Sequence, residues 1–275
     1  MTTLMEQEAR EAPRCIEQQL KANLPAWEAL KAEIAKKKPA FAVTIARGSS
    51  DHAATFAKYL FETYLGLPVV SAAPSIQTLY GKTLKMHSAL VIGISQSGKS
   101  PDLCEVMQHA KQQGALTVAL VNQTDSPLAH LANTVIPLHA GPEKAVAATK
   151  SYLTAISALS QGIAVLAGDV SLQNALQQLP ARMEEALQLP WDALLAALGT
   201  TQDMLTLGRG FGYPIAQEAA PQKDAAPPAA KEVIQETVKA PAAEAKTSPP
   251  EPKAAEPASL LDQIKPAQTA QPVQA

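Results

Sequence analysis

The sequence has few cysteines and few aromatic residues, and neither acidic nor basic residues are in large excess. Its two cysteines, Cys15 and Cys104, give neither a disulfide framework nor a C-x-x-C metal spacing, so we expect a reduced, cytoplasmic setting. A net charge of −2 excludes the strongly basic surface typical of nucleic-acid binding, and the run at 36–38 is short enough to be a solvated surface. With 47% hydrophobic residues in 275, the composition fits a soluble globular protein.

Long apolar runs are absent as well. The longest, at 158–167, is interrupted by Gln161 and Gly162 and is too short to cross a bilayer. The first fifteen residues carry acidic side chains and no apolar core, which excludes a secretory signal of the usual pattern. We therefore expect no membrane partner.

Glycine and aromatic residues disappear after residue 220. Residues 221–275 contain ten prolines and fourteen alanines, with acids and lysines alternating between them. Such a segment cannot bury enough apolar surface to offset the entropy lost on ordering. We therefore predict a low-complexity, disordered tail over 221–275.

Before residue 220, strand-length apolar runs alternate with helix-length segments. This alternation predicts a doubly wound α/β fold with a five-stranded parallel sheet in flavodoxin-like order. A helical block at 171–200 and a strand at 203–208, followed by a helix from 213, resemble the beginning of a second such unit. The other predicted strands are 41–46, 68–72, 88–95, 115–121 and 133–138, and the helices are 5–36 (divided at Pro25), 51–66, 73–80, 100–114 and 145–167.

Two hydroxyl-rich loops follow the first and third predicted strands, between which a flavodoxin-like sheet reverses its order. They read A-R-G-S-S-D-H at 46–52 and G-I-S-Q-S-G-K-S at 93–100, and each runs into a predicted helix. Helix N-termini and serine hydroxyls both donate hydrogen bonds to phosphate, and glycine lets the backbone approach it closely. The loops therefore favour a phosphate monoester, while Ser49 and Ser100 are also candidate helix caps.

The second loop also fits G-x-x-x-x-G-K-[ST], the phosphate loop of nucleotide hydrolases. In that class the motif normally follows the first core strand and works with a magnesium-binding carboxylate at the end of a neighbouring strand. Here it follows the third strand, and the next strand ends at Asn122, with Asp125 beyond it. A nucleotide site is therefore the less favoured alternative.

Four motifs together resemble the sugar isomerase (SIS) domain family. R-G-S-S-D-H-A, I-S-Q-S-G-K-S-P-D, G-P-E-K-A-V-A-A-T-K-S-Y and L-G-R-G-F-G-Y-P-I-A-Q-E-A-A occur in the family's order, and the match covers about residues 5–220. It is most similar to the isomerase part of glucosamine-6-phosphate synthase and to deaminases built from two SIS domains. The resemblance implies an N-terminal helical segment (1–38), a first SIS domain (39–170), a linker with an incomplete second SIS domain (171–220) and the tail (221–275).

The resemblance implies binding of an amino-sugar or ketose phosphate, of the glucosamine 6-phosphate or fructose 6-phosphate type. It further implies that no cofactor or metal is needed and that the chain forms a homodimer or higher homo-oligomer. An exposed apolar face is expected over 171–220, where the rest of a second domain would pack. Ala148 stands where many relatives have serine. The implied binding residues are Ser49, Ser50, Ser95, Gln96, Ser97, Ser100, Val146 and Ala148.

The resemblance leaves catalysis open. In the family, the segment after E-x-A ends in a glutamate that moves the proton between C1 and C2, and Ala225 stands at that position here. No glutaminase part with its N-terminal cysteine precedes the match, so we expect no aminotransfer from glutamine. Either the chain is an isomerase or deaminase that uses another base, with Glu143, His52 and His139 as weak candidates, or it is a non-catalytic sugar-phosphate-binding module.

Overall fold

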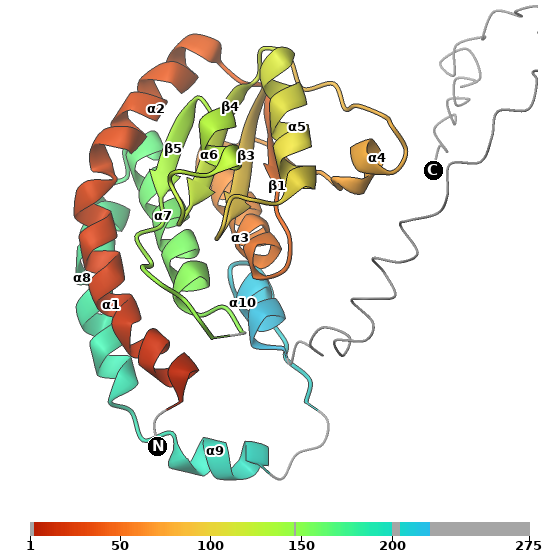
Figure 1. The fold of residues 1–275 in the computed structure, drawn as a ribbon. Coiled ribbons are helices and arrows are strands. Elements are labelled where there is room, and N and C mark those ends of the chain that lie inside the picture. The colour runs from red at the N-terminus through yellow and green to blue at the C-terminus, as the bar shows by residue number, and fades with distance from the viewer. Residues whose placement is uncertain (1–2, 146, 200–203, 221–275) are drawn as a thin grey trace, which may run out of the picture. The chain divides into compact units, whose positions relative to one another are not determined.

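The structure, a computed structural model, describes residues 3–145, 147–199 and 204–220 (Figure 1). The predicted tail, with Ala225, lies outside the described residues, and so does Val146. None of the described helices has the length and apolar character that crossing a membrane requires.

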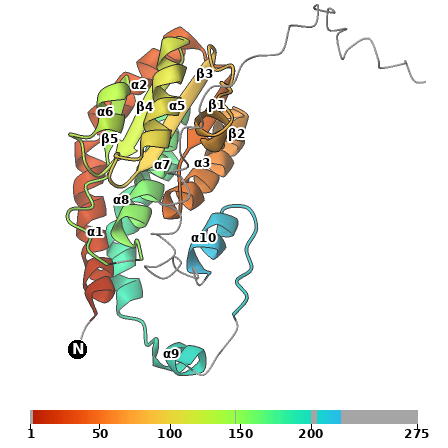
Figure 2. The same cartoon turned by 45° about the vertical axis from the view of Figure 1, so that its right-hand side comes forward.

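A five-stranded parallel sheet in the order β2-β1-β3-β4-β5 forms the centre of the fold (Figure 2). This confirms the predicted flavodoxin-like sheet. All residues of β3 and β4 are buried, because both faces of a doubly wound sheet are covered by helices. The strands are β1 (Phe41–Ile45), β2 (Val69–Ser71), β3 (Ala89–Ser95), β4 (Leu116–Val121) and β5 (Thr134–Pro137).

The two faces of the sheet carry separate hydrophobic cores. Alternate residues of β3 enter opposite cores, with Leu90 and Ile92 on one side and Val91 on the other. The first core also contains side chains of α2 (Leu24–Lys37), α3 (Ser49–Leu65) and α7 (Lys150–Ala167). The second contains those of α5 (Pro101–Gln112) and α6 (Pro127–Leu131), and α4 (Ser75–Thr78) lies beside α5.

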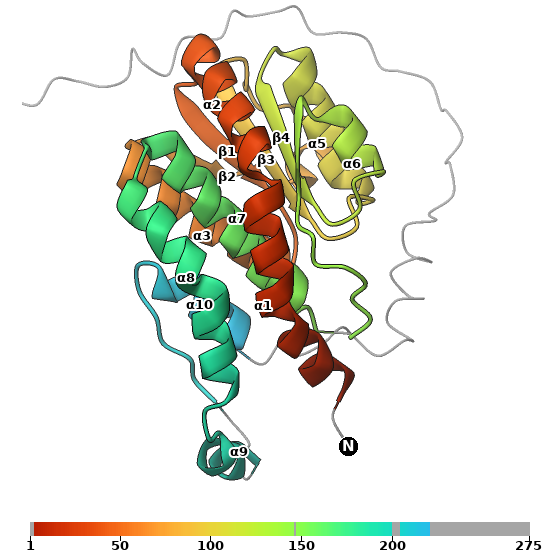
Figure 3. The same ribbon diagram turned by 90° about the vertical axis from the view of Figure 1, so that its left-hand side faces the viewer.

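Two further helices cover α7 on its outer side, α1 (Leu4–Ala22) and α8 (Val170–Leu187) (Figure 3). Ile16, Leu20 and Leu176 form a small core there with Ala164 of α7. The predicted division of the first helical segment is confirmed, because α1 ends before Asn23 and Pro25 lies in the first turn of α2. Proline is tolerated in a first turn, where its missing N–H has no partner within the helix.

Two predicted elements differ from the structure. The helix expected from residue 145 begins only at Lys150, because acidic side chains hold the backbone before it in a loop. The strand expected at 203–208 is wrong over its described part, 204–208, which is not a strand. A strand needs a neighbouring strand to accept its hydrogen bonds, and Leu205 and Leu207 are instead 81% and 84% exposed.

The segment after α8 exposes many apolar side chains, as the sequence predicts. The helical block divides into α8 and α9 (Asp192–Gly199), and α10 (Gly212–Ala219) matches the predicted last helix. Assignment of 171–220 to a linker and a second SIS unit remains a prediction. The exposed large apolar residues there are Leu189, Trp191, Leu194, Leu195, Leu198, Met204, Leu205, Leu207, Phe211, Tyr213 and Ile215.

Candidate functional site

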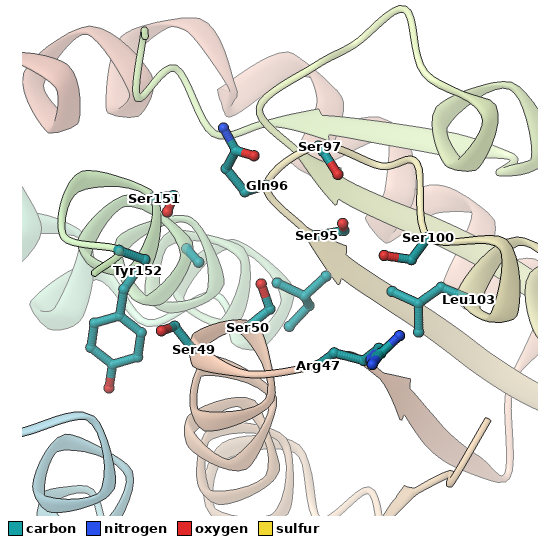
Figure 4. Close-up of a pocket in the computed structure, with 13 residues that line it drawn as sticks. Arg47, Ser49, Ser50, Ser95, Gln96, Ser97, Ser100, Leu103, Ser151 and Tyr152 are labelled. Atoms are coloured by element: carbon teal, nitrogen blue, oxygen red, sulfur yellow. The ribbon is translucent and has the colours of Figure 1, made fainter. Parts of the chain in front are cut away.

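A pocket of about 230 Å³ lies beyond the carboxyl ends of β1 and β3 (Figure 4). This is smaller than the roughly 300–1,000 Å³ of pockets that hold drug-sized ligands, and so suits a small metabolite. Three regions line it. The first is the loop after β1 with the first turn of α3, the second is the end of β3 with the loop and helix that follow, and the third is the first turns of α7 with the loop before them. The lining residues are Arg47, Ser49, Ser50, Ile94, Ser95, Gln96, Ser97, Ser100, Leu103, Ala148, Ser151, Tyr152 and Ala155.

The loop after β1 turns sharply at Gly48, whose φ of +58° is a conformation that favours glycine. Gly48 is the cap residue of α3, and its carbonyl accepts from the N–H of Asp51 at 2.8 Å. The prediction that Ser49 caps this helix is therefore wrong, since Ser49 is its first helical residue. The result is that Ser49 and Ser50 lie in the first turn of α3, on the pocket wall.

The loop after β3 is held by its own serines. Ser95 Oγ accepts from the N–H of Gly98 at 3.0 Å, and Ser97 Oγ accepts from the N–H of Lys99 at 3.3 Å. Each hydroxyl therefore keeps its hydrogen for donation to another acceptor. Ser100 occupies the predicted cap position of α5, but its side chain makes no capping bond and instead lines the pocket.

Gly98 fixes the shape of this loop. Its φ is +61°, and a Cβ at this position would lie 2.8 Å from the Cβ of Ser126 and 3.3 Å from Val121 Cγ1. The carbonyl of Gly98 accepts from Leu128 N–H at 3.0 Å, which ties the loop to α6. The backbone of the loop is therefore packed against the segment after β4.

The third wall comes from the N-terminal end of α7. Glu143 accepts from the N–H groups of Thr149 at 2.9 Å and Ser151 at 3.1 Å, and from the Ser151 hydroxyl at 2.5 Å. Tyr152 directs its hydroxyl away from the serines and toward α10, where it donates to the carbonyl of Pro214 at 3.2 Å (Figure 4). Burial, with a contribution from the Glu218 carboxylate, raises the pKa of Tyr152 to about 12, so its hydroxyl stays neutral.

Arg47 is the one charged side chain among the described lining residues. Its Nη1 lies 3.3 Å from Asp102 Oδ2, and its side chain remains 67% exposed. Sequence reasoning did not select Arg47, although a cation beside the glycine at a strand end was a usable signal. It also missed Ser151 and Tyr152, which stand in a quoted motif but about fifty residues from the nearest serine loop.

The three weak candidates for a catalytic base lie outside the pocket lining. His52 Nδ1 pairs with Glu218 Oε2 at 2.6 Å, and Glu143 is used by the backbone of α7. His139 has a φ of +56°, and its Nε2 lies 3.2 Å from Asn23 Oδ1. Burial lowers the pKa of His139. The described pocket lining therefore contains no carboxylate and no imidazole.

The residues that a nucleotide site would need are used elsewhere. Asn122 donates to the carbonyl of Gly141 at 2.8 Å and accepts from Ala140 N–H at 2.9 Å. The side chain of Asp125 is 97% exposed and pairs with His130. Within the described ranges no three His, Cys, Asp or Glu residues gather closely enough to hold a metal ion. The geometry therefore gives the nucleotide alternative no support.

Residues 33–164 match the model of the SIS domain family. Among curated relatives, a glutamine–fructose-6-phosphate aminotransferase of Bradyrhizobium diazoefficiens is 35% identical over 186 residues, which are 63% of this chain and 30% of the relative. That of Aquifex aeolicus is 34% identical over 221 residues, which are 78% and 36% of the two chains. The chain thus spans about a third of the length of these relatives.

Solved structures show the same fold. A candidate phosphosugar isomerase of Silicibacter pomeroyi is 38% identical with a TM-score of 0.75, over 78% of this chain and 66% of that one. The C-terminal domain of a glucosamine-fructose-6-phosphate aminotransferase of Francisella tularensis is 26% identical with a TM-score of 0.63, over 79% and 65%. Tagatose-6-phosphate ketose/aldose isomerase of Escherichia coli, at 16% identity and a TM-score of 0.63, shares the fold.

Proposed function

The chain contains a SIS domain homologous to the isomerase region of glutamine–fructose-6-phosphate aminotransferases, and from this premise we propose that its serine-lined pocket binds a sugar phosphate. The observation that carries the proposal is the convergence of serines from two separate loops on one pocket beside Arg47. Hydrogen bonds to a charged group contribute roughly 1.5–3 kcal/mol each, so three or four hydroxyls suffice to anchor a small phosphate ester.

The pocket has a phosphate end and a sugar end in this proposal. Ser95 ends β3, and Ser97 and Ser100 lie in the loop that leads from it into α5. The N-terminus of α5 adds free N–H groups and the positive end of the helix dipole. Ala148 and Ser151 lie on the opposite wall and contact the sugar. Glucosamine 6-phosphate and fructose 6-phosphate are the ligands that the relatives' names favour.

We propose that the chain binds a sugar phosphate without converting it. The described pocket lining offers no carboxylate or imidazole, and proton transfer between C1 and C2 of a sugar needs a positioned base. The alternative is an isomerase or deaminase, which the 38% identity to a candidate phosphosugar isomerase favours. That alternative requires a base from outside the described lining.

Thermal unfolding with and without ligand, combined with coupled turnover assays, tests the proposal. We expect glucosamine 6-phosphate and fructose 6-phosphate to stabilise the chain, by about 2.7 kcal/mol at a hundred times Kd, and unphosphorylated glucosamine and fructose not to. Stabilisation together with turnover would support the isomerase or deaminase alternative and contradict a non-catalytic binding module. No stabilisation by either phosphate would contradict both.

We propose a cytoplasmic, homo-oligomeric protein. Both cysteines are free thiols, which suits a reducing compartment. The exposed apolar side chains of α9, such as Leu194, Leu195 and Leu198, are of the kind that protein interfaces cover.

A further inference from the structure

A loop without regular secondary structure carries one wall of the pocket. The described parts of this loop, 138–145 and 147–149, connect β5 to α7. Ala148 of the loop and Ser151, just after it, line the pocket. A loop of this kind keeps its shape only if other groups satisfy its backbone N–H groups.

Glu8 of α1, more than 130 residues earlier in the sequence, accepts hydrogen bonds from two of these N–H groups. Its side chain is buried, with the residue only 4% exposed. Glu8 Oε1 accepts from the N–H of Lys144 at 2.6 Å, and Oε2 accepts from the N–H of Ala145 at 3.2 Å. A carboxylate is costly to bury unless it is hydrogen-bonded, and these charge-assisted bonds compensate that cost.

Glu11, one helical turn further along α1, holds the other end of the loop. Its Oε2 accepts from Nζ of Lys150 at 2.5 Å, and the same Nζ donates to the carbonyl of Pro142 at 2.8 Å. Lys150 is 1% exposed and is the first residue of α7, where the positive end of the helix dipole disfavours a cation. The Glu11 carboxylate provides the negative charge that makes Lys150 tolerable there.

We infer that Glu8 and Glu11 are positioning residues of the ligand pocket, through which α1 shapes the sugar-facing wall. This inference rests on the proposed sugar-phosphate function. Helix α1 ends at Ala22, before the SIS match begins at residue 33, so the wall depends on an element outside that domain. The serine loops after β1 and β3 make no contact with Glu8 or Glu11 among the described hydrogen bonds. Loosening the wall therefore weakens recognition of the sugar and leaves the phosphate end intact.

Glu8→Gln in the full chain tests this, with Kd measured for glucosamine 6-phosphate and for inorganic phosphate. An amide oxygen still accepts but carries no charge, so we expect the Kd for glucosamine 6-phosphate to rise about tenfold and that for phosphate to stay within about twofold. Glu17→Gln is the matched control, because Glu17 lies on α1 in an exposed pair with Lys21. This control is expected to change neither Kd.

Glu11→Gln is the second variant if Glu8→Gln does not fold, because the Glu11 side chain is 60% exposed and a glutamine oxygen can still accept from Lys150 Nζ. It is expected to raise the Kd for glucosamine 6-phosphate in the same selective way. An unchanged Kd for glucosamine 6-phosphate, or an equal loss for both ligands, would overturn the inference. If the unaltered chain binds no sugar phosphate at all, the proposed function itself fails.

Discussion

Ser95, the last residue of β3, and Ser97, in the loop after it, differ in the backbone groups that their hydroxyls bind. Ser95 is buried, and its hydroxyl accepts the N–H of Gly98, which shapes the turn. Ser97 accepts the exposed N–H of Lys99 at 3.3 Å, a longer bond that the loop can lose. Ser97 is therefore the better residue for separating ligand binding from loop structure.

Ser97→Ala is expected to weaken sugar-phosphate binding by roughly one to two orders of magnitude, because it removes one hydrogen bond to a charged group. Isothermal titration calorimetry with glucosamine 6-phosphate measures this. Ser160→Ala is the control, since the Ser160 hydroxyl bonds to the carbonyl of Ile156 within α7 and lies outside the pocket lining. Unchanged affinity in Ser97→Ala would remove Ser97 from the site.

Arg47→Gln is expected to raise the Kd of a sugar phosphate by about tenfold and to weaken its dependence on salt. The reason is that Arg47 is the charged group of the described lining, and a phosphate is attracted to it through solvent that salt screens. Titrations at low and high salt give both quantities. In the matched control, Lys99→Gln, the neutralised residue is a lysine of the loop after β3 that does not line the pocket. A larger effect of Lys99→Gln would favour the nucleotide alternative.

His139 makes stability depend on pH. Burial lowers its pKa below 6.5 in the folded chain, so the unfolded chain binds more protons between the two values. The free energy of unfolding therefore falls as the pH drops through 6.5, until the folded-state pKa is passed. His139→Asn keeps a residue that tolerates the φ of +56° and is expected to flatten this slope. Urea unfolding between pH 5 and 7 measures it, and an unchanged slope would contradict the assignment.

Sequence alone was enough to select Ser95, Ser97 and Ser100 as binding residues, but not to identify all the other residues that line the pocket. Glycine and hydroxyl residues directly after a predicted strand carry a local signal for Ser95, Ser97 and Ser100. Ser151 and Arg47 line the pocket only because of where α7 packs and how Arg47 reaches toward α5. Such positions depend on contacts between distant segments, which no local pattern records.

At the scale of elements, the packing of α2 on α7 depends on a glycine. A Cβ on Gly162 would lie 2.5–2.7 Å from the ring atoms of Trp27, which is 2% exposed and has no room to move within the core. Gly162→Ala is therefore expected to lower the free energy of unfolding by about 1–3 kcal/mol through overpacking. Gly199→Ala in α9 is the control, because nothing lies within 4 Å of a Cβ there. Equal effects of the two substitutions in denaturant unfolding would show that Trp27 does not limit this site.

The boundaries of elements followed from sequence where the signal was local. Pro25 marked the start of α2, and Gly66 marked the end of α3. The start of α7 was missed by five residues, because Glu143 accepts from the Thr149 N–H, which in a helix from residue 145 would bond to the carbonyl of Ala145. The strand predicted at 203–208 is absent over its described part, 204–208. A sequence pattern alone cannot supply the neighbouring strand to which a strand must bond.

For the whole molecule, the sheet order was the most predictable feature. Five apolar runs separated by helices leave few topologies once parallel connections are required, and the order β2-β1-β3-β4-β5 is one of them. The exposed apolar residues between 189 and 215 were also foreseen, because the family resemblance implies that the rest of a second SIS domain would pack against 171–220.

Sedimentation velocity tests whether self-association covers these exposed apolar residues. We expect a species larger than a monomer at micromolar concentration, because exposed apolar side chains of this extent favour self-association. Replacing Leu194 and Leu195, which are 49% and 62% exposed, by serine is expected to shift the distribution toward monomer. A monomer at all concentrations in the unaltered chain would contradict a homo-oligomer.

A crystal structure with glucosamine 6-phosphate would test directly whether the serine-lined pocket binds the phosphate of a sugar phosphate. We expect a phosphate within about 2.5–3.2 Å of the Ser95, Ser97 and Ser100 hydroxyls, and a sugar against Ala148 and Ser151. A ligand bound elsewhere, with these hydroxyls still making only their contacts within the loop, would contradict it.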